Sequence, residues 1–504
     1  MQKWRVFCLL LACVLCISCW AAAEEEGGDS PSFLMAGFDN TQYRDWQNNQ
    51  FFLRMEEKTG VHLVLRQSKT EEDWAQVKSA MAAGDDGMAD VLFKASLTTQ
   101  ECIALREKGV LIDLKPYLES CCPNLWALIQ KEPAILAAIT LPDGSIAALP
   151  YITPIPMQNY LWINQKWLDS LRLSAPTNAE ELTQVLTAFR DRDPNHNGRQ
   201  DEIPLSFQGP FDLKFLAHAF GLIANDYNIF VENGQVKFMP LEDGYRQFVA
   251  WCRELYKEKL LDQNGFITTV SQTVTDSKAT PNCGIVMTYL AGDTFRVSWA
   301  TDYVILNPMT YQGEQIYREF AWPVSRGTFA ITSACKDPET MLRWVDTLYT
   351  EEGATLALVG QENVDYLVDG DGTWRFVDSI QSNYDMFRGG TLIDGGAMYP
   401  GILAEEFQKK MGGSAMVQNV LSQQEAFAEY TQMPFPYYTL TREQESKVTA
   451  LQNEIGYYVD MQLARWVLGE EEISDETFAA FENKLQELGL NDFLAFWQDI
   501  LDQR

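Results

Sequence analysis

The chain has 504 residues, of which 46% are hydrophobic, 12% are aromatic and 22% are charged. This is the composition of a globular protein with a large core, and it excludes a disordered chain or a collagen-like repeat. The formal net charge of -31 would repel a phosphate backbone, and the sequence contains no basic run. Nucleic-acid binding is therefore excluded as well.

The first residues predict an export signal. Lys3 and Arg5 precede an apolar stretch, residues 6–23, that is too short for a comfortable membrane span. We expect residues 1–23 to be a signal peptide and residues 24–31 to be an acidic linker. Cleavage after Ala23 would release a secreted protein, cleavage before Cys19 would leave a lipid-anchored one, and an uncleaved anchor is the third alternative.

Six cysteines follow the predicted signal: Cys102, Cys121, Cys122, Cys252, Cys283 and Cys335. Their spacing matches no zinc pattern, and in so long a chain it predicts buried free thiols rather than a disulfide framework. The whole chain has only 3 histidines, which argues against a catalytic triad that uses histidine and against a multi-histidine metal site.

The first hundred exported residues alternate between strand and helix patterns. Ser32–Phe38 is predicted as a strand, and apolar residues then recur at helical spacing from Trp46 until Gly60 ends the helix. Residues 61–65 alternate as the next strand, residues 74–81 form a second helix, and residues 90–93 form a third strand. This alternation is typical of an α/β fold with a mainly parallel sheet, in which ligands bind at the edge where the strands end.

Capping signals mark the later helices. Asp337 and Pro338 predict the start of a helix that ends near Gly353. Residues 366–376, with a turn at 369–372, predict a β-hairpin. Thr441 opens a long helix that Gly469 ends, and two shorter helices are expected to begin at Ser474 and Asn491.

An acidic loop at residues 193–202 has the spacing of a calcium site. Oxygen-bearing side chains occupy its positions 1, 3, 5 and 9, a glycine occupies position 6, and the residue at position 7 would offer a backbone carbonyl. Position 12 is a proline, so the acid at position 10 must complete the coordination. The candidate ligands are Asp193, Asn195, Asn197, Arg199, Asp201 and Glu202. The alternative is a polar surface turn without a metal.

The same region resembles a known family. Residues 162–205, which include WLDSL and DPNHNGRQDEIPL, are similar to a segment of the extracellular solute-binding proteins of ABC sugar importers, in particular the large lipoproteins that bind oligosaccharides. Residues 117–125, 144–151, 331–360 and 440–468 resemble the same family, so the likeness spans nearly all of the exported chain. Lys166 and Arg172 depart from the usual pattern, the second because glycine is common there.

The resemblance implies a two-lobed α/β fold of the type II periplasmic-binding-protein kind, with mainly parallel sheets flanked by helices and hinge strands between the lobes. It implies lobe 1 from residues 32–151 and 286–360, and lobe 2 from residues 152–285 and 361–504. It also implies a structural calcium ion at the acidic loop, because relatives bind the ion through the matching positions.

A carbohydrate site needs aromatic faces and a rim of polar groups. We looked for both where predicted strands end or lobes cross, although each aromatic residue has core packing as its alternative. The candidates are Trp46, Tyr151, Tyr289 and Trp322 for the sugar faces, and Asp39, Asn40 and Arg326 for the hydroxyls. Arg326 has a solvated surface position as its alternative, and Asp39 and Asn40 form a plain turn in theirs.

Three classes of function stay open from the sequence. The resemblance predicts a monomeric, exported protein at the cell surface that captures an oligosaccharide and delivers it to ABC transporter permease subunits, without being an enzyme. A secreted glycoside hydrolase would need only two opposed carboxylates, and none of the spacings among the acids singles out such a pair. A surface glycan receptor that does not serve transport would look the same.

Overall fold

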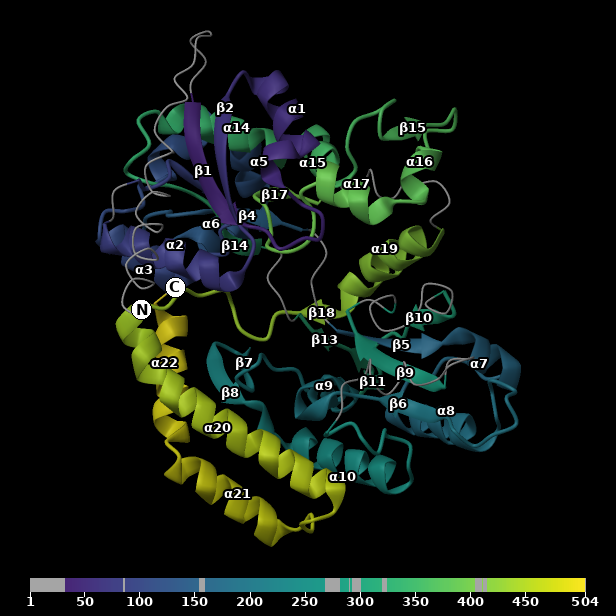
Figure 1. Ribbon diagram of the computed structural model, residues 1–504. Coiled ribbons are helices and arrows are strands. Elements are labelled where there is room, and N and C mark those ends of the chain that lie inside the picture. The colour runs from purple at the N-terminus through teal and green to yellow at the C-terminus, as the bar shows by residue number, and fades with distance from the viewer. Residues whose placement is uncertain are drawn as a thin grey trace, which may run out of the picture.

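The computed structural model shows two lobes, one above the other in Figure 1. It describes residues 32–84, 87–153, 159–267, 282–289, 291, 301–319, 324–403, 410 and 415–503. The predicted signal peptide and linker, including Cys19, lie outside the described residues, as does Trp322. Among the described residues, no helix is long and apolar enough to cross a membrane.

Lobe 1, the upper lobe in Figure 1, contains a six-stranded sheet in the order β17-β4-β14-β3-β1-β2. β1 runs parallel to its neighbours β2 and β3, and β4 runs parallel to β17. β14 runs antiparallel to both of its neighbours, β3 and β4. The strands are β1 Ser32–Phe38, β2 His62–Ser68, β3 Val91–Phe93, β4 Leu149–Ile152, β14 Val324–Ile331 and β17 Gly401–Ile402. The three strands and the two intervening helices predicted between residues 32 and 93 are thus confirmed.

Helices cover both faces of this sheet because alternate residues of β1 and β3 are buried on opposite sides. Phe33, Met35 and Phe93 face a core that α1, α5 and α14 close, whereas Ala36 and Leu92 face a smaller core under α2 and α3. The helices of lobe 1 are α1 Gln50–Thr59, α2 Glu71–Ala83, α3 Thr99–Glu107, α4 Leu118–Cys121, α5 Pro123–Lys131, α6 Pro133–Ile139, α14 Pro338–Asp346, α15 Glu351–Leu358, α16 Asp378–Gln381 and α17 Tyr384–Thr391. The predicted hairpin is confirmed as β15 Tyr366–Val368 and β16 Trp374–Phe376.

Lobe 2 contains a four-stranded sheet in the order β10-β5-β9-β6. β5 runs antiparallel to β10 and β9, and β6 is parallel to β9. The strands are β5 Tyr160–Asn164, β6 Ile203–Ser206, β9 Cys283–Thr288 and β10 Tyr303–Ile305. Short pairs join β7 Ile229–Glu232 to β8 Gln235–Phe238, β11 Thr310–Tyr311 to β12 Glu314–Gln315, and β13 Tyr317–Arg318 to β18 Thr431–Gln432.

The helices of lobe 2 share one large hydrophobic core with its sheet. They are α7 Gln165–Leu171, α8 Ala179–Asp191, α9 Gly209–Phe215, α10 Asp243–Lys257, α19 Ala415–Phe427, α20 Arg442–Leu468, α21 Asp475–Glu487 and α22 Leu490–Asp502. The long C-terminal helix α20 has the predicted capping box at Thr441 and ends at Gly469 in the left-handed conformation, as predicted. Arg172 ends α7 in the same conformation, with φ 55°.

The lobe boundaries differ from those that the resemblance implied. β9 pairs with β5 and β6, and Tyr303 and Tyr317 lie in the core of lobe 2, so the chain stays in lobe 2 until Arg318 and does not return at residue 286. Ile393 and Tyr399 lie in the core of lobe 1, so lobe 1 continues through β17 and does not end at residue 360. The chain therefore crosses between the lobes three times, after β4, after β13 and after β17.

Two local predictions also need correction. Asp337 caps α14 through a hydrogen bond from the Thr340 amide, as predicted, but this helix ends at Asp346, and Gly353 lies in the first turn of the following helix α15. Glycine at that place did not end a helix, because the capping hydroxyl of Thr350 starts a new one. The last helix begins at Leu490, after Gly489, rather than at Asn491.

The cysteines behave as the sequence predicts. Cys102, Cys121, Cys122, Cys252, Cys283 and Cys335 are all free thiols, and all but the last are buried. Burial raises the pKa of the Cys102 thiol to about 12, so the thiol stays protonated and unreactive at neutral pH.

Gly327 provides a test of the sheet of lobe 1. It has φ 71°, and a Cβ atom there would lie 2.0 Å from the carbonyl oxygen of Leu97. We expect Gly327→Ala to lower the free energy of unfolding by more than about 2 kcal/mol, because both the left-handed conformation and the backbone clash oppose it. Urea denaturation measures the loss. Gly370→Ala is the matched control, since nothing lies within 4 Å of its Cβ position; an equal loss in both variants would contradict the explanation.

Candidate functional site

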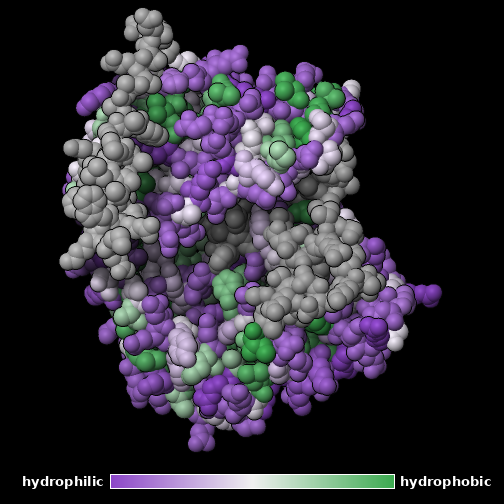
Figure 2. Space-filling view, in the orientation of Figure 1, coloured by the Kyte–Doolittle hydropathy of each residue, from purple (hydrophilic) through white to green (hydrophobic). Residues whose placement is uncertain are grey.

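In both lobes, strands end at the sheet edge where the chain passes to the other lobe. In lobe 1 the chain leaves at the ends of β4 and β17, which lie at the same edge as the ends of the parallel strands β1 and β3. In lobe 2 the chain enters at the start of β5, so the antiparallel β9 and its parallel neighbour β6 end at this edge. Figure 2 shows the surface hollowed between the two halves of the molecule. Ligands of open α/β sheets bind at such edges, so this cleft is the candidate site.

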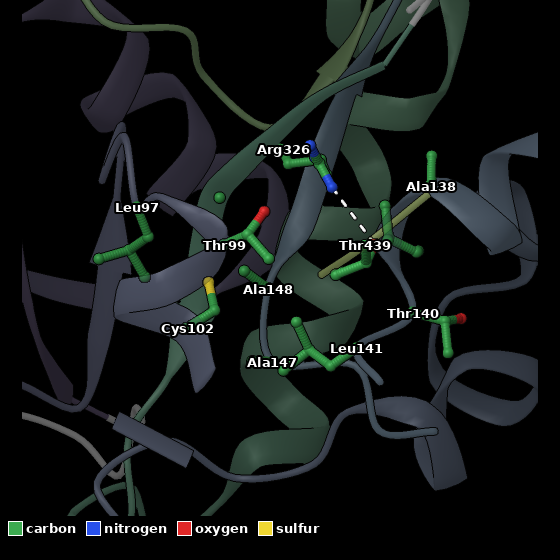
Figure 3. Close-up of a pocket in the computed structure, with 12 residues that line it drawn as sticks. Leu97, Thr99, Cys102, Ala138, Thr140, Leu141, Ala147, Ala148, Arg326 and Thr439 are labelled. Carbon is green, nitrogen blue, oxygen red and sulfur yellow. Dashed lines mark hydrogen bonds between the residues drawn. The ribbon is translucent and has the colours of Figure 1, made fainter. Parts of the chain in front are cut away.

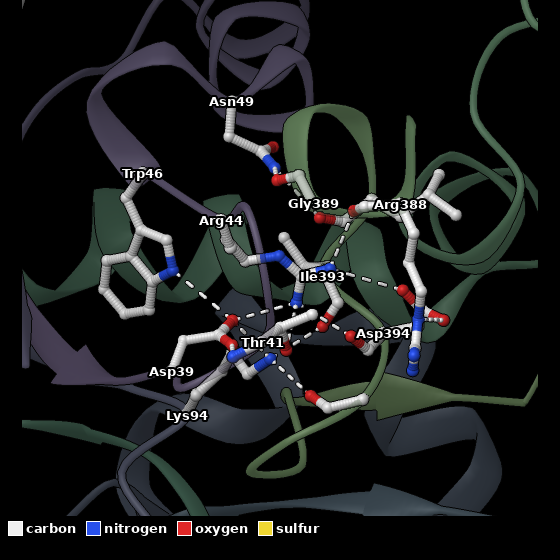
Figure 4. Close-up of polar contacts among 12 residues, drawn as sticks. Asp39, Thr41, Arg44, Trp46, Asn49, Lys94, Arg388, Gly389, Ile393 and Asp394 are labelled. Atoms are coloured by element: carbon white, nitrogen blue, oxygen red, sulfur yellow. Dashed lines mark hydrogen bonds and ion pairs between the residues drawn. The ribbon is translucent and has the colours of Figure 1, made fainter. Parts of the chain in front are cut away.

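The turn after β1 supplies Asp39 and Asn40, and the structure treats them differently. Asn40 is exposed at the edge of the sheet. Asp39 is fully buried, and its carboxylate accepts hydrogen bonds from Lys94 Nζ at 2.7 Å and Arg44 at 2.9 Å (Figure 4). Burial alone would raise the pKa of Asp39, but the positive charges of Lys94 and Arg44 lower it. Asp39 therefore supports the edge from behind, and Asn40 is the exposed member of the pair.

Trp46 lies in the core of lobe 1 and not on the surface of the cleft. It is 1% exposed, its ring lies 5.4 Å from that of Phe52 and 5.8 Å from that of Phe93, and its indole nitrogen points to Asp39 at 3.5 Å. The alternative of core packing therefore describes its position here. Figure 4 shows the indole beside the carboxylate of Asp39.

Tyr151 and Tyr289 come from different lobes. Tyr151 lies in β4 of lobe 1, one residue before the strand ends, and its ring lies 5.2 Å from that of Tyr399, just before β17. Tyr289 follows β9 in lobe 2 and is partly exposed. Burial raises the pKa of the Tyr151 phenol above its ordinary value, and the nearby phenol of Tyr289 contributes to the shift. The two candidate aromatic residues, one from each lobe, thus lie close enough for their phenols to interact electrostatically.

Arg326 lies where lobe 1 meets the C-terminal helices. Its guanidinium points toward the Thr439 hydroxyl at 3.4 Å (Figure 3), and burial lowers its pKa. A cavity of about 190 Å³ adjoins it, lined from lobe 1 by Thr99 and Gln100 and from lobe 2 by Tyr227 and Tyr438. Arg326 is thus a partly buried residue at the contact between the lobes, rather than a fully solvated surface side chain. Trp322 lies outside the described residues and stays a prediction.

The cleft edge of lobe 2 carries groups that the sequence did not single out. Asp212, 3% exposed, accepts hydrogen bonds from the Gln208 amide at 2.7 Å and from the Asn159 side chain at 3.2 Å. Arg318, just before the second crossing, pairs with Asp226 at 2.7 Å. Burial raises the pKa of Asp212 to about 6, although its hydrogen bonds and the charge of Arg318 oppose this shift. Asn159, which precedes β5 at the first crossing, therefore donates to the buried carboxyl group of Asp212. Arg318, which precedes the second crossing, lies close enough to influence the pKa of the same group.

Arg318 also stacks on two aromatic rings of helix α9. Its guanidinium carbon lies 4.4 Å from the centre of the Phe215 ring and 5.4 Å from that of Phe211. Such contacts hold a buried cation in a fixed orientation. An arginine before a crossing strand carries no sequence signal for this role, because the aromatic partners are about a hundred residues away.

The acidic loop is folded as a cation-binding loop would be. The carboxylate of Asp193 accepts hydrogen bonds from the amides of Asn197 and Gly198, each at 3.0 Å, and Asn197 Nδ2 donates to Asp201 at 2.8 Å. Gly198 has φ 74°, which provides the sharp turn expected there. These hydrogen bonds turn the side-chain oxygens toward the inside of the loop.

Glu202 has an unusual environment in this loop. Both of its carboxylate oxygens are buried and have no hydrogen-bond partner among the described residues. Burial raises its pKa, and the neighbouring carboxylates of Asp201 and Asp193 add to the shift. A buried, unpartnered carboxylate beside two others fits a bound cation. Within the described residues, however, no three His, Cys, Asp or Glu side chains already converge as a metal site.

The comparisons with known proteins agree with this architecture. No family model matches the chain. It is 24% identical over 475 residues to the fructooligosaccharide ABC transporter substrate-binding protein FusA of Streptococcus pneumoniae serotype 4, covering 89% of this chain and 86% of that protein. It is 24% identical over 217 residues, 41% of each chain, to the polygalacturonan/rhamnogalacturonan-binding protein YtcQ of Bacillus subtilis.

Solved structures show the same fold. A solute-binding protein of Bifidobacterium longum infantis that binds human milk oligosaccharides superposes with a TM-score of 0.78 at 21% identity, over 94% of this chain and 99% of that one. FusA in complex with kestose gives a TM-score of 0.70 at 23% identity, with the same coverage. The fold class predicted from the sequence is confirmed, and so is the resemblance to solute-binding proteins of sugar ABC importers.

Asp212 makes the stability of the protein depend on pH in a definite direction. Because its pKa is raised in the folded state, the folded protein binds more protons than the unfolded chain between about pH 6 and the ordinary carboxyl pKa near 4. This carboxyl group therefore favours folding at low pH and opposes it as the pH rises through 6. We expect the free energy of unfolding of wild type relative to Asp212→Asn to rise by about 2 kcal/mol between pH 7.5 and pH 4. Urea denaturation at each pH measures it, and a pH-independent difference would contradict the assignment.

Proposed function

We propose that the protein is the extracellular substrate-binding component of an ABC transporter, which captures an oligosaccharide between its two lobes and delivers it to the membrane permease. The observation that carries this proposal is the similarity to FusA over nearly the whole of both chains, together with a cleft formed by the strand ends of both lobes. Transport requires that the permease distinguish the loaded protein from the empty one. Closure of two lobes about a ligand provides that difference.

The proposed ligand contacts are candidate groups near the strand ends that border the cleft. Asn40 would bind hydroxyl groups at the edge of lobe 1, Tyr151 and Tyr289 would pack on sugar faces, and Arg326 would contribute donors from the side of the C-terminal helices. Asp39 and Trp46 would support Asn40 from the core. Trp322 stays among the proposed contacts on the basis of its sequence position alone.

The cellular setting follows from the same proposal. The N-terminal signal would export the protein, and lipidation of Cys19 would hold it at the outer face of the cell membrane, close to the permease. Without lipidation the protein would be secreted. A monomer suffices, because one chain supplies both lobes of the site.

We propose that the protein is not an enzyme. The relatives are named as binding proteins, and the polar groups brought together at the cleft serve hydrogen bonding and support. Asp212 has a raised pKa, as a general acid would, but both of its oxygens already accept hydrogen bonds from the chain. A glycoside hydrolase would need two carboxyl groups facing one another across the bound sugar.

We further propose a structural calcium ion in the loop of residues 193–202. Solved structures with the same fold include a FusA EF-hand mutant bound to fructo-nystose, with a TM-score of 0.70, and an alginate-binding protein, AlgQ2, described as without calcium ion, with a TM-score of 0.66. Asp193, Asn195, Asn197, Asp201 and Glu202 would supply side-chain oxygens, and Arg199 would supply its carbonyl. The unpartnered carboxylate of Glu202 is the feature of this chain that supports the ion.

Ligand capture can be tested with the classes of sugar that the relatives are named for. We expect kestose, a human milk oligosaccharide or an oligogalacturonate to raise the melting temperature of the protein and to change its tryptophan fluorescence. The released sugar should have the same mass and linkage as the sugar that was added. Tyr289→Ala should weaken binding about tenfold or more by calorimetry, because an aromatic sugar contact is lost. Tyr457→Ala, at a residue that is 73% exposed on α20, is the control and should bind normally. Turnover of a bound sugar that one carboxylate substitution abolishes would assign a hydrolase instead.

The calcium proposal predicts that the order of stability of wild type and Glu202→Gln reverses between chelator and calcium. Calcium at a hundredfold excess over its dissociation constant should stabilise wild type by about 3 kcal/mol, and a chelator should remove this gain. Asp193→Ala should lose the response to calcium. Glu202→Gln should be more stable than wild type in chelator, because it removes a buried unpaired charge, and less stable than wild type in calcium. Differential scanning calorimetry measures both; melting curves that chelation leaves unchanged would remove the ion from the proposal.

A further inference from the structure

Three charged side chains are buried together at the cleft edge of lobe 1. Asp39 and Lys94 are 0% exposed and Arg44 is 2% exposed, and one carboxylate oxygen of Asp39 binds both cations. Asp39 directly follows β1, and Lys94 directly follows β3. We call these three residues the edge triad. It occupies the ends of the two central parallel strands, where the ligand of such a sheet is bound.

The edge triad holds a distant segment by its backbone. Lys94 Nζ donates to the carbonyl oxygens of Ile393 and Gly395, each at 2.8 Å. Arg44 donates to the carbonyl oxygens of Arg388 at 2.9 Å and Asp394 at 2.7 Å. Figure 4 shows these donors converging on the segment of residues 388–395, about three hundred residues further along the chain.

The neutral side chain of Asn49 also holds this segment. Asn49 Nδ2 donates to the carbonyl oxygens of Gly389 and Leu392, both at 3.0 Å, while its Oδ1 caps helix α1. Buried main-chain carbonyl groups need donors, and here Lys94, Arg44 and Asn49 supply them for a segment that has little regular structure after α17.

The fastened segment continues directly into the surface of the cleft. A Cβ atom on Gly396 would lie 3.1 Å from Asn40 Oδ1, so the segment touches the exposed asparagine at the end of β1. Tyr399, three residues further, packs on Tyr151 at 5.2 Å. The position of the segment thus fixes two of the proposed ligand contacts, one polar and one aromatic.

Stability alone does not account for three buried charges at this place. Replacing a buried ionic cluster by apolar side chains of similar volume is often neutral or stabilising, because the charges lose their hydration. A cluster of charges does define geometry, since each donor has a fixed direction toward its acceptor. The edge triad binds main-chain groups of one segment, and that segment borders the cleft.

We propose that Lys94 and Arg44, bound to Asp39, are positioning residues for the oligosaccharide: they hold residues 388–396 so that Asn40 and the Tyr151–Tyr399 pair present one rigid surface to the ligand. This inference rests on the proposed function. It assigns a role in affinity to side chains that do not touch the ligand themselves.

The test is Lys94→Met, which keeps the length of the side chain and removes the donors. We expect the variant to fold, with unchanged far-UV circular dichroism, and to bind the oligosaccharide that wild type binds at least tenfold more weakly by calorimetry at 15 °C, below any shifted melting transition. Asn49→Ser is the second variant. Its hydroxyl retains the helix cap and loses the amide donors to residues 389 and 392, so it should weaken binding in the same direction even if Lys94→Met does not fold.

Arg54→Met is the matched control. Arg54 pairs with Asp365 in the same lobe, with side chains 13% and 9% exposed, and this pair does not touch the segment of residues 388–396. We expect this variant to lower the melting temperature and to leave the affinity within twofold of wild type. A purely structural role for the edge triad would make Lys94→Met behave like Arg54→Met.

A double-mutant cycle with Asn40→Ala separates positioning from general loosening. If the edge triad acts through Asn40, the double variant Lys94→Met/Asn40→Ala should bind less than threefold more weakly than the weaker of the two single variants. Fully additive losses, or an affinity of folded Lys94→Met and Asn49→Ser equal to that of wild type, would overturn the inference. A wild-type protein that binds no oligosaccharide would instead overturn the proposed function.

Discussion

The arrangement of the two lobes depends on the hydrogen bonding of three strands, β4, β14 and β17, at the sheet edge where the chain passes between the lobes. Tyr151 of β4 pairs with Ser325 of β14 on one side and with Gly401 of β17 on the other. All three connections are thereby held within the width of three strands. The same constraint brings the strand ends of both sheets to face one another.

Charge is used differently in three parts of the molecule. Around Asp39 the buried carboxylate is matched by two cations and many oriented donors, so it defines a fixed geometry. Asp212 is matched only by hydrogen bonds and a nearby arginine, and it retains a raised pKa. Glu202 has no partner among the described residues and lies beside other acids. Asp39 thus has the environment of a structural scaffold, Asp212 that of a proton-sensitive contact and Glu202 that of a cation site. The difference follows from how completely the protein solvates each carboxylate.

The sequence predicted the local structure well because local signals decide it. The spacing of apolar residues located β1, β2 and the early helices, and side-chain caps such as Thr441 and Asp337 located helix starts. The candidate site was harder to predict. Tyr151 and Tyr289 were chosen because they lie where predicted strands end or lobes cross, and they stay predictions; Trp46 was chosen by the same rule and lies in the core. The sequence did not single out Lys94 or Arg44, because their main-chain acceptors lie about three hundred residues further along the chain. The crossing at residue 286 was wrong because an apolar strand looks the same whether it enters another lobe or pairs within its own.

The three crossings also have a consequence for how the polypeptide matures. Lobe 1 lacks its central strand β14 and its edge strand β17 until residues 324–402 have emerged, and the core of lobe 2 lacks α20 and α22 until the last residues are made. Neither half can complete its packing during vectorial synthesis, so the nascent polypeptide exposes incomplete sheets for most of its length. If the chain is exported as proposed, such delayed folding would keep it threadable through a secretion channel, and final assembly would take place in the compartment beyond.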